Sequence, residues 1–468
     1  MTLSSRFDAI SPLDSRFYGG DAQLYAALHP YLSEEGRVRA QARAEAALAR
    51  ALAEEGIAPE AAADAIAASA ERIGAAEVYA EEARIGHDVR ALVNLIRAKV
   101  PEDARRFVHL GATSMDVVDT ANAWRYREAV DRVLLPRLGL LASRLIALAE
   151  GEADTAQAGR THGQHAVPIT FGFAVAEYVS RLGNRILFLR WAAHALPGKL
   201  SGAVGAYNAP SLLTKDPRAL ERRYLAHLGL VPASHSTQIV EPEAWSDLAH
   251  ACVTALGVMA NLADDMRHLQ RTEIAEIAEG FRAEQVGSST MPQKRNPVSF
   301  ENVKSIWKAF MPRVITTYLD QISEHQRDLT NSASQRFSGE LLAATAYAAT
   351  RLGASVDGIR IERERMKANL GLSKGGIIAE ALYVLLAKHG HHDAHEAVRR
   401  LTLEADRSGK GMLELAALDP ELRPVLASLT PDERRVLDQP EEYRGLAADV
   451  ARDVATTWRA RLAGILPE

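Results

Sequence analysis

Gly287-Ser-Ser-Thr-Met-Pro-Gln-Lys-Arg-Asn-Pro297 is the stretch of this sequence with the most distinctive composition. Glycine tolerates unusual backbone angles, and the two prolines fix φ and remove backbone donors. These residues predict a loop that can open and close. The loop carries a nucleophile or base, Ser288 or Ser289, together with the cation of Lys294 and the amide of Asn296. An ordinary surface turn would explain any one of these residues, but it explains the whole stretch poorly.

The chain beyond this loop is predicted to be helical, and so is most of the rest. Apolar residues recur every three or four positions after the loop, as on the buried face of a helix. Alanine is abundant, and only 6% of residues are aromatic, a composition that favours helix. Strands do not alternate with helices, and no glycine-rich phosphate loop follows a strand, which argues against an α/β nucleotide-binding fold. The predicted fold class is therefore all-α.

Hydrophobic spacing predicts three long helices, near residues 125–150, 175–189 and 246–281. Rods of this kind suit a helical bundle, and here we expect a bundle shared between subunits. The 468 residues are expected to form three domains. These are an N-terminal helical domain over 1–112, with 1–30 irregular and helix breaks at Gly56, Pro59 and Gly74, a central long-helix domain over 113–366, and a small helical domain over 367–468.

Charge and cysteine content narrow the possible partners and compartment. A net charge of −5 gives no indication of nucleic acid or an anionic membrane as partner. No apolar run reaches membrane-spanning length, and the start of the chain has no signal-peptide core. The single Cys252 excludes an intrachain disulfide and suits a reducing cytosol. Because Cys252 lies on an apolar helical stripe, we interpret it as a buried structural thiol.

Three further segments carry residues that suit catalysis or binding. Thr113 or Ser114 can cap a helix, and the free N–H groups at that helix start could equally bind a carboxylate. His162 and His165 lie in a glycine- and proline-bearing stretch, 159–168, that we expect to be a loop; their spacing fits a metal site, but no cysteine or helical glutamate supports one. Arginines and a serine in residues 326–336 suit a phosphate, since guanidinium forks match phosphate oxygens, although a solvated face is the commoner explanation of such charge.

The motif Gly-Ser-Ser-x-Met-Pro-x-Lys-x-Asn-Pro resembles the signature of the fumarase/aspartase superfamily. The resemblance implies a three-domain all-α fold with a central bundle of long helices. Members of the superfamily release fumarate or a close analogue by β-elimination of a C–N or C–O bond. The resemblance also implies a homotetramer, and we expect shared active sites because long helices separate His87, His162 and Ser288. The chemistry requires no metal or organic cofactor.

Other segments resemble the adenylosuccinate lyase family within that superfamily. They are Ser11-Pro-Leu-Asp-Ser-Arg-Phe17, Gly86-His-Asp-Val89, Arg160-Thr-His-Gly-Gln164, Thr237-Gln-Ile239 and the arginine-bearing stretch 326–336. The chain departs from the family pattern at three positions: Phe17 replaces a tyrosine, Gly86 an asparagine and Met115 a serine. The implied substrate is a succinylated purine nucleotide. The implied reactions convert adenylosuccinate to AMP and fumarate, and the succinyl-carboxamide ribotide of purine synthesis to its carboxamide and fumarate.

The resemblance also implies roles for individual residues. Ser288 would be the base that removes the proton next to a carboxylate, and Lys294 would stabilise the resulting aci-carboxylate. His162 would protonate the leaving nitrogen. His87 would orient the phosphate side, and Glu301 would orient or polarise a histidine. The implied substrate-binding residues are Arg16, Phe17, Asp88, His109, Thr113, Ser114, Thr161, Gln238, Asn296, Arg327, Ser332 and Arg336.

Two alternative functions remain open at this stage. A carboxymuconate cycloisomerase would share Gly-Ala-Thr-Ser-x-Asp and Lys-Arg-Asn-Pro with this chain, but it would not be expected to carry Arg-Thr-His-Gly-Gln or Arg-Asp-Leu-Thr-Asn-Ser. A structural protein built on the same fold would be expected to lose the base, the acid or the lysine. Ser288, His162 and Lys294 are all present, which favours an enzyme.

Overall fold

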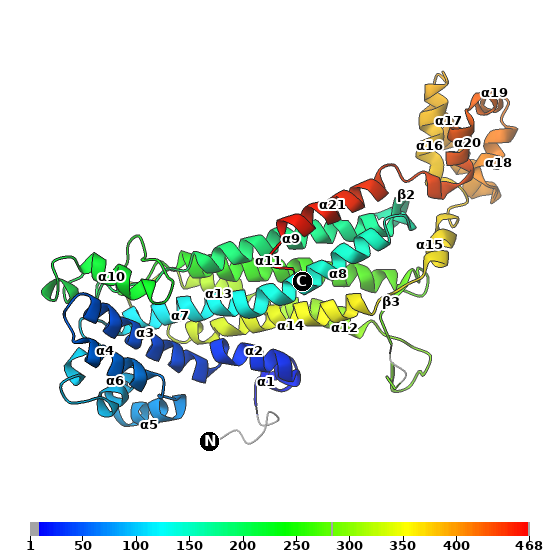
Figure 1. Cartoon of the computed structure of the whole chain (residues 1–468). Coiled ribbons are helices and arrows are strands. Elements are labelled where there is room, and N and C mark those ends of the chain that lie inside the picture. The colour runs from blue at the N-terminus through cyan, green and yellow to red at the C-terminus, as the bar shows by residue number, and fades with distance from the viewer. Residues whose placement is uncertain (1–8, 282–283, 467–468) are drawn as a thin grey trace. The chain divides into compact units, whose positions relative to one another are not determined.

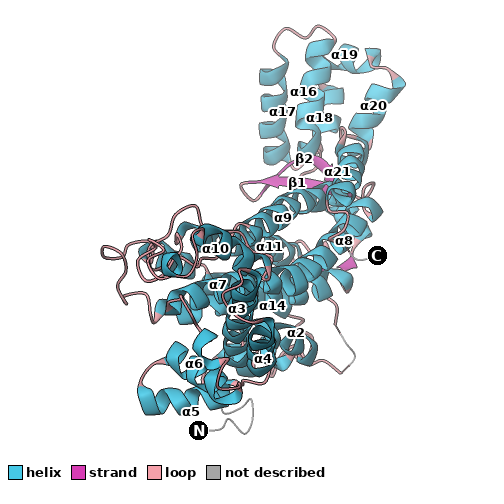
Figure 2. Ribbon diagram, turned by 60° about the vertical axis from the view of Figure 1, so that its left-hand side comes forward, coloured by secondary structure: helices cyan, strands magenta, loops and turns pink. Residues whose placement is uncertain are grey.

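The computed structural model describes residues 9–281 and 284–466, and the fold is all-α, as the composition predicts. Helices make up 65% of the chain, and the few strands stand out in Figure 2. The α-helices before the first strand are α1 Pro12–Ser15, α2 Ala22–Leu32, α3 Glu34–Glu54, α4 Glu60–Ala70, α5 Ala75–Ile85, α6 Asp88–Lys99, α7 Ser114–Ala129 and α8 Leu135–Gly151, with a π-helical turn, Val130–Leu134, between the last two.

The remaining elements run from the first strand to the C-terminal helix, and most of them are labelled in Figure 1. They are β1 Ala156–Thr161, β2 Gln164–Thr170, α9 Phe171–His194, α10 Pro217–Ala226, α11 Glu243–Leu269, β3 Ile277–Ala278, α12 Val298–Phe310, α13 Arg313–Leu319, α14 Ser338–Asp357, β4 Arg360–Ile361, α15 Arg363–Leu370, α16 Ala379–Lys388, α17 Ala394–Ser408, α18 Met412–Leu418, α19 Leu422–Ser428, α20 Pro431–Asp438 and α21 Ala447–Arg461.

The described chain packs into two compact units. The first unit consists of the described parts of Met1–Leu138, Arg185–Gly257 and Ser305–Thr350, and the second of Gly139–Asn184, Val258–Lys304 and Arg351–Glu468. The borders fall inside long helices, so that α9, α11 and α14 contribute residues to both units. The three-domain division at residues 112 and 366 stays a prediction.

In the first unit, the three predicted helix breaks are found, but the start of the chain differs from the prediction. The breaks near Gly56, Pro59 and Gly74 separate α3, α4 and α5. Residues 1–30 were expected to be irregular, but α1 and most of α2 lie within them. Two local caps explain the difference: the Ser11 hydroxyl accepts the N–H of Leu13, and the Asp21 carboxylate accepts two N–H groups at the start of α2.

The core of the first unit contains the one cysteine of the sequence. Cys252 is buried on α11, as its place on an apolar stripe predicts. Burial raises the pKa of its thiol to about 12, so that the thiol stays protonated and unreactive at neutral pH. None of the described helices has both the length and the apolar character needed to cross a membrane.

In the second unit, β1 and β2 pair antiparallel and form a hairpin where the sequence analysis expected a loop. Its turn consists of His162 and Gly163, which have φ of 54° and 75°. Two consecutive residues with positive φ form a type I′ turn, whose twist matches that of the strands it connects. The histidine at the first turn position hid this hairpin from sequence analysis, because asparagine, aspartate or glycine is usual there.

The third long helix is shorter than predicted. Helix α11 ends at Leu269, whereas the apolar spacing suggested a helix to about residue 281. Two features account for the early end: the side chain of Glu276 is buried in a separate polar network, and the backbone of Ala275 adopts a left-handed φ of 52°. The segment after α11 then enters the short strand β3, which pairs with β4.

Helix α21 packs against α9 within the second unit, and a glycine permits the contact. A Cβ at Gly183 would lie 2.2 Å from Cε3 of Trp458, whose side chain is buried. We expect Gly183→Ala to destabilise the protein by about 1–3 kcal/mol, because the added methyl group overpacks this contact. Thermal unfolding followed by circular dichroism would measure the effect. Gly151→Ala is the matched control, since that helix position has open space around it and should be neutral or stabilising. Equal melting temperatures for the two variants would show that the α9–α21 contact tolerates a methyl group.

Candidate active site

A cavity of about 580 Å³ in the first unit brings together several of the residues singled out from the sequence. It lies among helices α1, α2, α6, α7 and α14 and the segment 327–336. A volume of this size suits a small-molecule ligand of nucleotide dimensions. The predicted binding and catalytic residues that line it are His87, Asp88, Ser114, Gln238, Arg327, Ser332 and Arg336.

Arg327 gives this cavity the character of an anion site. Its Nε and Nη1 atoms are buried and have no hydrogen-bond partner within the described chain. Buried donors without partners are unfavourable, so the guanidinium is poised for an acceptor that a ligand would supply. Arg336 lies on the same cavity, half-exposed, and its nearest carboxylate is Glu34 at 3.9 Å. Two guanidinium groups with spare donors match the oxygens of a phosphate.

Aromatic side chains line another part of the same cavity, and sequence reasoning missed them. The rings of Tyr18 and Tyr25 stack with 6.2 Å between centroids, and His29 lies 5.5 Å from Tyr25. The hydroxyl of Tyr18 donates to the Asp14 carboxylate. Burial and this carboxylate raise the pKa of Tyr18, so its phenol stays neutral. Tyr25 and His29 are four residues apart on α2 and therefore share one face of this helix. This spacing was the sequence signal that could have revealed them.

Two neighbouring residues from the sequence analysis do not line the cavity. Arg16 is the C-terminal cap of α1, where its backbone N–H donates to Pro12 O. The ring of Phe17 packs against that of Tyr347, with 5.2 Å between centroids. Tyr18, one position further along, therefore provides an aromatic ring on the cavity wall.

His87 and Ser114 stand at helix starts on the cavity wall. His87 is the N-cap of α6, and its Nδ1 accepts the N–H of Arg90 at 3.3 Å while the ring stays half-exposed. Ser114 is the first residue of α7, directly after the N-cap Thr113. Free N–H groups and the helix dipole at such starts favour a negatively charged ligand. Asp88 lies 3.8 Å from the Arg37 guanidinium.

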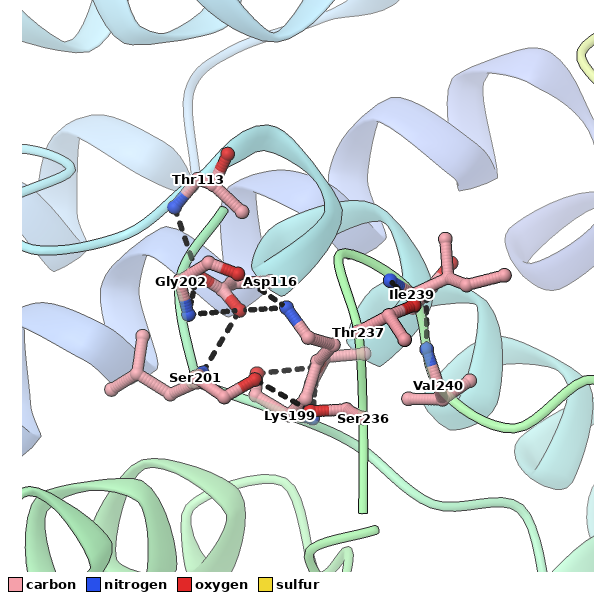
Figure 3. A network of polar contacts seen from close by, with 12 residues as sticks. Thr113, Asp116, Lys199, Ser201, Gly202, Ser236, Thr237, Ile239 and Val240 are labelled. Carbon is pink, nitrogen blue, oxygen red and sulfur yellow. Dashed lines mark hydrogen bonds and ion pairs between the residues drawn. The ribbon is translucent and has the colours of Figure 1, made fainter. Parts of the chain in front are cut away.

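A buried polar network holds the start of α7 in place (Figure 3). The carboxylate of Asp116 forms an ion pair with Lys199 and accepts the N–H groups of Thr113 at 2.8 Å and Ser201 at 3.1 Å. Asp116 and Lys199 are both fully buried. The hydroxyl of Ser201 lies 2.7 Å from that of Ser236, which extends the network to the segment before Gln238. Neither partner of this ion pair was singled out from the sequence.

Asp119, one turn further along α7, fixes the segment that carries Gln238. Its carboxylate accepts the N–H of Val240 at 2.9 Å. The backbone N–H of Gln238 donates to Gln326 O at 3.4 Å, beside Arg327. Burial raises the pKa of Asp119 to about 6, although the Val240 N–H opposes the shift. Asp119 is thus a carboxyl group that titrates close to neutrality.

His109 lies outside the cavity lining and is paired with a buried carboxylate. Its Nδ1 is 2.6 Å from Oε1 of Glu45, whose side chain is fully buried. Burial disfavours the charged imidazole, but the Glu45 carboxylate outweighs this effect and raises the pKa of His109. The positive φ of 63° at His109 shows that the chain turns sharply here, just before α7.

The second unit holds the remaining predicted residues. Thr161 and His162 are exposed at the tip of the β1–β2 hairpin. His165, for which the resemblance implies no role, is partly buried on β2. Burial and the nearby Arg160 lower the pKa of His165, which keeps this imidazole neutral. The two histidines therefore differ in exposure, and His162 is the more exposed of the two.

Residues 284–297 form a compact loop around Ser288 in the same unit. The Ser288 hydroxyl oxygen accepts the N–H groups of Thr290 at 3.3 Å and Met291 at 3.1 Å. Hydrogen bonds donated to an oxygen favour its ionised form, so these two groups would stabilise an alkoxide. Ser289 makes no such contact within the described chain. The geometry therefore favours Ser288 over Ser289 as a base.

The two ends of this loop are held together by a side-chain hydrogen bond and by close approach of the backbone. Asn296 Nδ2 donates to Gly287 O at 3.2 Å. A Cβ at Gly287 would lie 2.1 Å from Lys294 O, so only glycine fits. Lys294 and Glu301 are both exposed. Asn296 thus has a structural contact in this conformation, in addition to the binding role inferred from the motif.

Within the described residues, one group has donor atoms close enough to hold a metal ion: His391, His392 and Glu421. The Nδ1 of His391 accepts the N–H of Asp393 at 3.1 Å. This bond places the ring proton of a neutral His391 on Nε2, the nitrogen that faces Glu421 at 3.5 Å. The rings of His391 and His392 also stack in nearly parallel planes, so their lone pairs do not converge. The cluster is a histidine–carboxylate contact and a poor metal site.

The predicted residues therefore fall into two groups. The cavity of the first unit is lined by His87, Ser114 and the two arginines. The hairpin tip and the loop around Ser288 lie in the second unit. The Asp116–Lys199 pair and the tyrosines of the cavity wall complete the first group, and the sequence alone did not reveal them.

Comparison with known proteins identifies the family. The lyase family profile matches residues 16–310, and the profile for the adenylosuccinate lyase C-terminal region matches residues 323–433. The adenylosuccinate lyase of Pyrococcus horikoshii is 35% identical over 95% of this chain and 97% of its own length. That of Methanocaldococcus jannaschii is 30% identical over 96% of each chain.

Solved structures show the same fold. A 3-carboxy-cis,cis-muconate lactonizing enzyme from Pseudomonas putida superposes with a TM-score of 0.81 at 27% identity, covering 93% of this chain and 97% of its own. A fumarate lyase from Mesorhizobium also gives 0.81, at 26% identity, covering 92% and 97%. These solved structures share the fold at 26–27% identity. The profile for the adenylosuccinate lyase C-terminal region and the 30–35% identity to adenylosuccinate lyases identify the family more narrowly. On this evidence, the chain belongs to the adenylosuccinate lyase family of the fumarase/aspartase superfamily.

Proposed function

We infer that this chain is a carbon–nitrogen lyase that cleaves adenylosuccinate to AMP and fumarate by β-elimination. The observation that carries the inference to this substrate is the cavity of the first unit. There, the buried Nε and Nη1 of Arg327 have no partner within the described chain, and Arg336 stands beside them. A muconate cycloisomerase has no phosphate to bind, so this pair of guanidinium groups favours a phosphorylated ligand over the alternative.

The same binding chemistry extends to a second substrate, the succinyl-carboxamide ribotide. It shares the phosphate and the succinyl-amino linkage with adenylosuccinate and differs in the base. The phosphate would lie against Arg327, Ser332 and Arg336. The N–H groups at the start of α7, with Thr113 and Ser114, would donate hydrogen bonds to a carboxylate of the succinyl group.

The proposed mechanism assigns the proton transfers to two side chains. Ser288, with its hydroxyl oxygen already accepting two backbone N–H groups, removes the proton next to a carboxylate. Lys294 and Asn296 stabilise the aci-carboxylate that forms, because positioned donors act most strongly on developing charge. His162 then protonates the leaving nitrogen as the C–N bond breaks. His87 orients the phosphate side, and Glu301 orients or polarises a histidine.

We also propose that the protein is a cytoplasmic homotetramer whose active sites contain residues of more than one chain. His162, Lys294 and Glu301 are exposed in the single chain. Elimination through a charged intermediate needs a site that excludes water, and the walls that a single chain leaves open can come from neighbouring subunits.

The assignment of the base can be tested by substitution. Ser288→Ala is expected to lower turnover of adenylosuccinate by at least about 10²-fold, the low end of the range for general base catalysis, while substrate still binds. The loss of adenylosuccinate is followed by ultraviolet absorbance and binding by calorimetry. Ser289→Ala is the matched control and should keep most of the activity, because Ser289 has no alkoxide-stabilising contact. Near-normal turnover in Ser288→Ala would move the base elsewhere.

The phosphate site can be tested through product binding. Arg327→Gln is expected to weaken AMP binding by roughly 10- to 100-fold, since a hydrogen bond to a charged group contributes about 1.5–3 kcal/mol. Binding of fumarate, which has no phosphate, should change little. Calorimetric titration with each ligand gives both values, and Arg132→Gln, an exposed arginine paired with Glu128, is the control. Equal weakening of AMP and fumarate would indicate general destabilisation and contradict the assignment.

Shared active sites can be tested by complementation. Inactive Ser288→Ala and His162→Gln chains are mixed, gently unfolded and reassembled. If a site takes His162 and Ser288 from different chains, some mixed sites contain neither substitution and activity returns. His165→Gln, which should keep its activity, serves as the control for a hairpin substitution. Activity that stays at background, although mass spectrometry shows mixed oligomers, would place both residues in one chain and refute this part of the proposal.

A further inference from the structure

Glu276 is a buried carboxylate that the proposed mechanism does not use. Its side chain is fully buried in the second unit, between α11 and β3. Oε2 accepts a hydrogen bond from Nε2 of Gln157 at 2.7 Å, and Oε1 accepts one from Nδ2 of Asn369 at 2.8 Å. The Arg160 guanidinium donates to both oxygens, at 2.5 Å and 3.1 Å. The carboxylate is therefore saturated with donors.

The backbone around Glu276 is as firmly held as its side chain. Its N–H donates to Leu269 O at 3.0 Å, and its C=O accepts the N–H of Glu362 at 2.9 Å. A buried charge is tolerated only with such complete compensation, and removal of one partner of a buried ion pair is strongly destabilising. Glu276 is thus a fixed point to which other segments are attached.

Glu276 holds strand β1, which leads to His162. Gln157 and Arg160 both belong to β1, and the turn of His162 and Gly163 follows Arg160 after one residue. The Arg160 guanidinium also donates back to Ala158 O at 3.2 Å, which keeps its side chain along the strand. A two-residue turn with fixed dihedral angles leaves little freedom between this anchor and the imidazole.

We propose that Glu276 is a positioning residue, which fixes through Arg160 the hairpin that presents His162 to the substrate. The proposal rests on the role of His162 as proton donor in the proposed function. It assigns Arg160, part of the Arg-Thr-His motif, to an internal ion pair with Glu276, which already occupies both of its terminal nitrogens. Direct binding of substrate by Arg160 is the competing assignment.

Loss of the anchor should slow the reaction without weakening binding. A displacement of about 1 Å in a reacting group can lower a rate by about 10²-fold. Glu276→Gln keeps the size of the side chain but replaces an acceptor with a donor and removes the charge. We expect kcat for adenylosuccinate to fall about 10- to 100-fold and KM to change by less than about 3-fold. Glu150→Gln, which breaks the exposed ion pair with Arg459 in the same unit, is the control and should keep full activity.

The double variant Glu276→Gln/His162→Gln separates positioning from general structural damage. If Glu276 acts through His162, the double variant is no slower than His162→Gln alone, because residues that act as a unit are not additive. If the rate losses of the two single variants instead multiply in the double variant, the proposal is wrong. If His162→Gln alone keeps normal turnover, the proton-donor role has failed instead, so the two failures are distinguishable.

Arg160→Lys provides a second measurement in case Glu276→Gln does not assemble. It keeps the charge of the ion pair and loses the two-pronged geometry, so a smaller fall in kcat with an unchanged KM is expected. Size-exclusion chromatography and thermal unfolding establish that each variant is folded and assembled. A rise in KM with kcat unchanged in Arg160→Lys would mean that Arg160 touches the substrate, and it would overturn the proposal.

Discussion

The buried ion pair of Asp116 and Lys199 is the interaction on which the first unit's binding cavity depends. Two unlike charges removed from water are stable only when each is fully hydrogen-bonded. Asp116 meets this condition with the ammonium group of Lys199 and the N–H groups of Thr113 and Ser201. These donors come from two separate segments, so the condition for burying the charge also brings together the start of α7 and the loop after Lys199.

The same arrangement, a buried carboxylate that accepts hydrogen bonds from separate segments, recurs in the second unit with Glu276. There, one carboxylate collects donors from β1 and α15, and the hairpin tip follows directly. In both units the anchor is buried while the residues proposed to meet the substrate, such as Ser114 and His162, lie nearer the surface. The position of a side chain on a turn or at a helix start depends on the residues that hold that backbone in place. A fully hydrogen-bonded carboxylate a few residues away, such as Asp116 or Glu276, therefore gives it a defined position.

The two groups of site residues differ in chemistry as well as in place. The first unit provides cations and an aromatic wall, with buried guanidinium nitrogens that await an acceptor. The second provides an exposed histidine, His162, and a serine whose hydroxyl oxygen accepts the N–H groups of Thr290 and Met291. The proposed function therefore assigns binding and proton transfer to separate parts of the chain.

The sequence alone determined the fold class, because alanine-rich segments with apolar residues every three or four positions can be stable only as packed helices. It also determined the residues with distinctive chemistry, since motifs such as Gly287–Pro297 are contiguous. It could not determine the Asp116–Lys199 pair, whose partners are 83 residues apart, or the network around Glu276, which reaches from Gln157 to Asn369. The early end of α11 was missed for the same reason, whereas the β1–β2 hairpin was missed because a histidine stands at the first position of its turn. Local propensity describes neighbours along the chain, whereas a buried charge takes its donors from wherever packing brings them, and only the tertiary structure decides which donors those are.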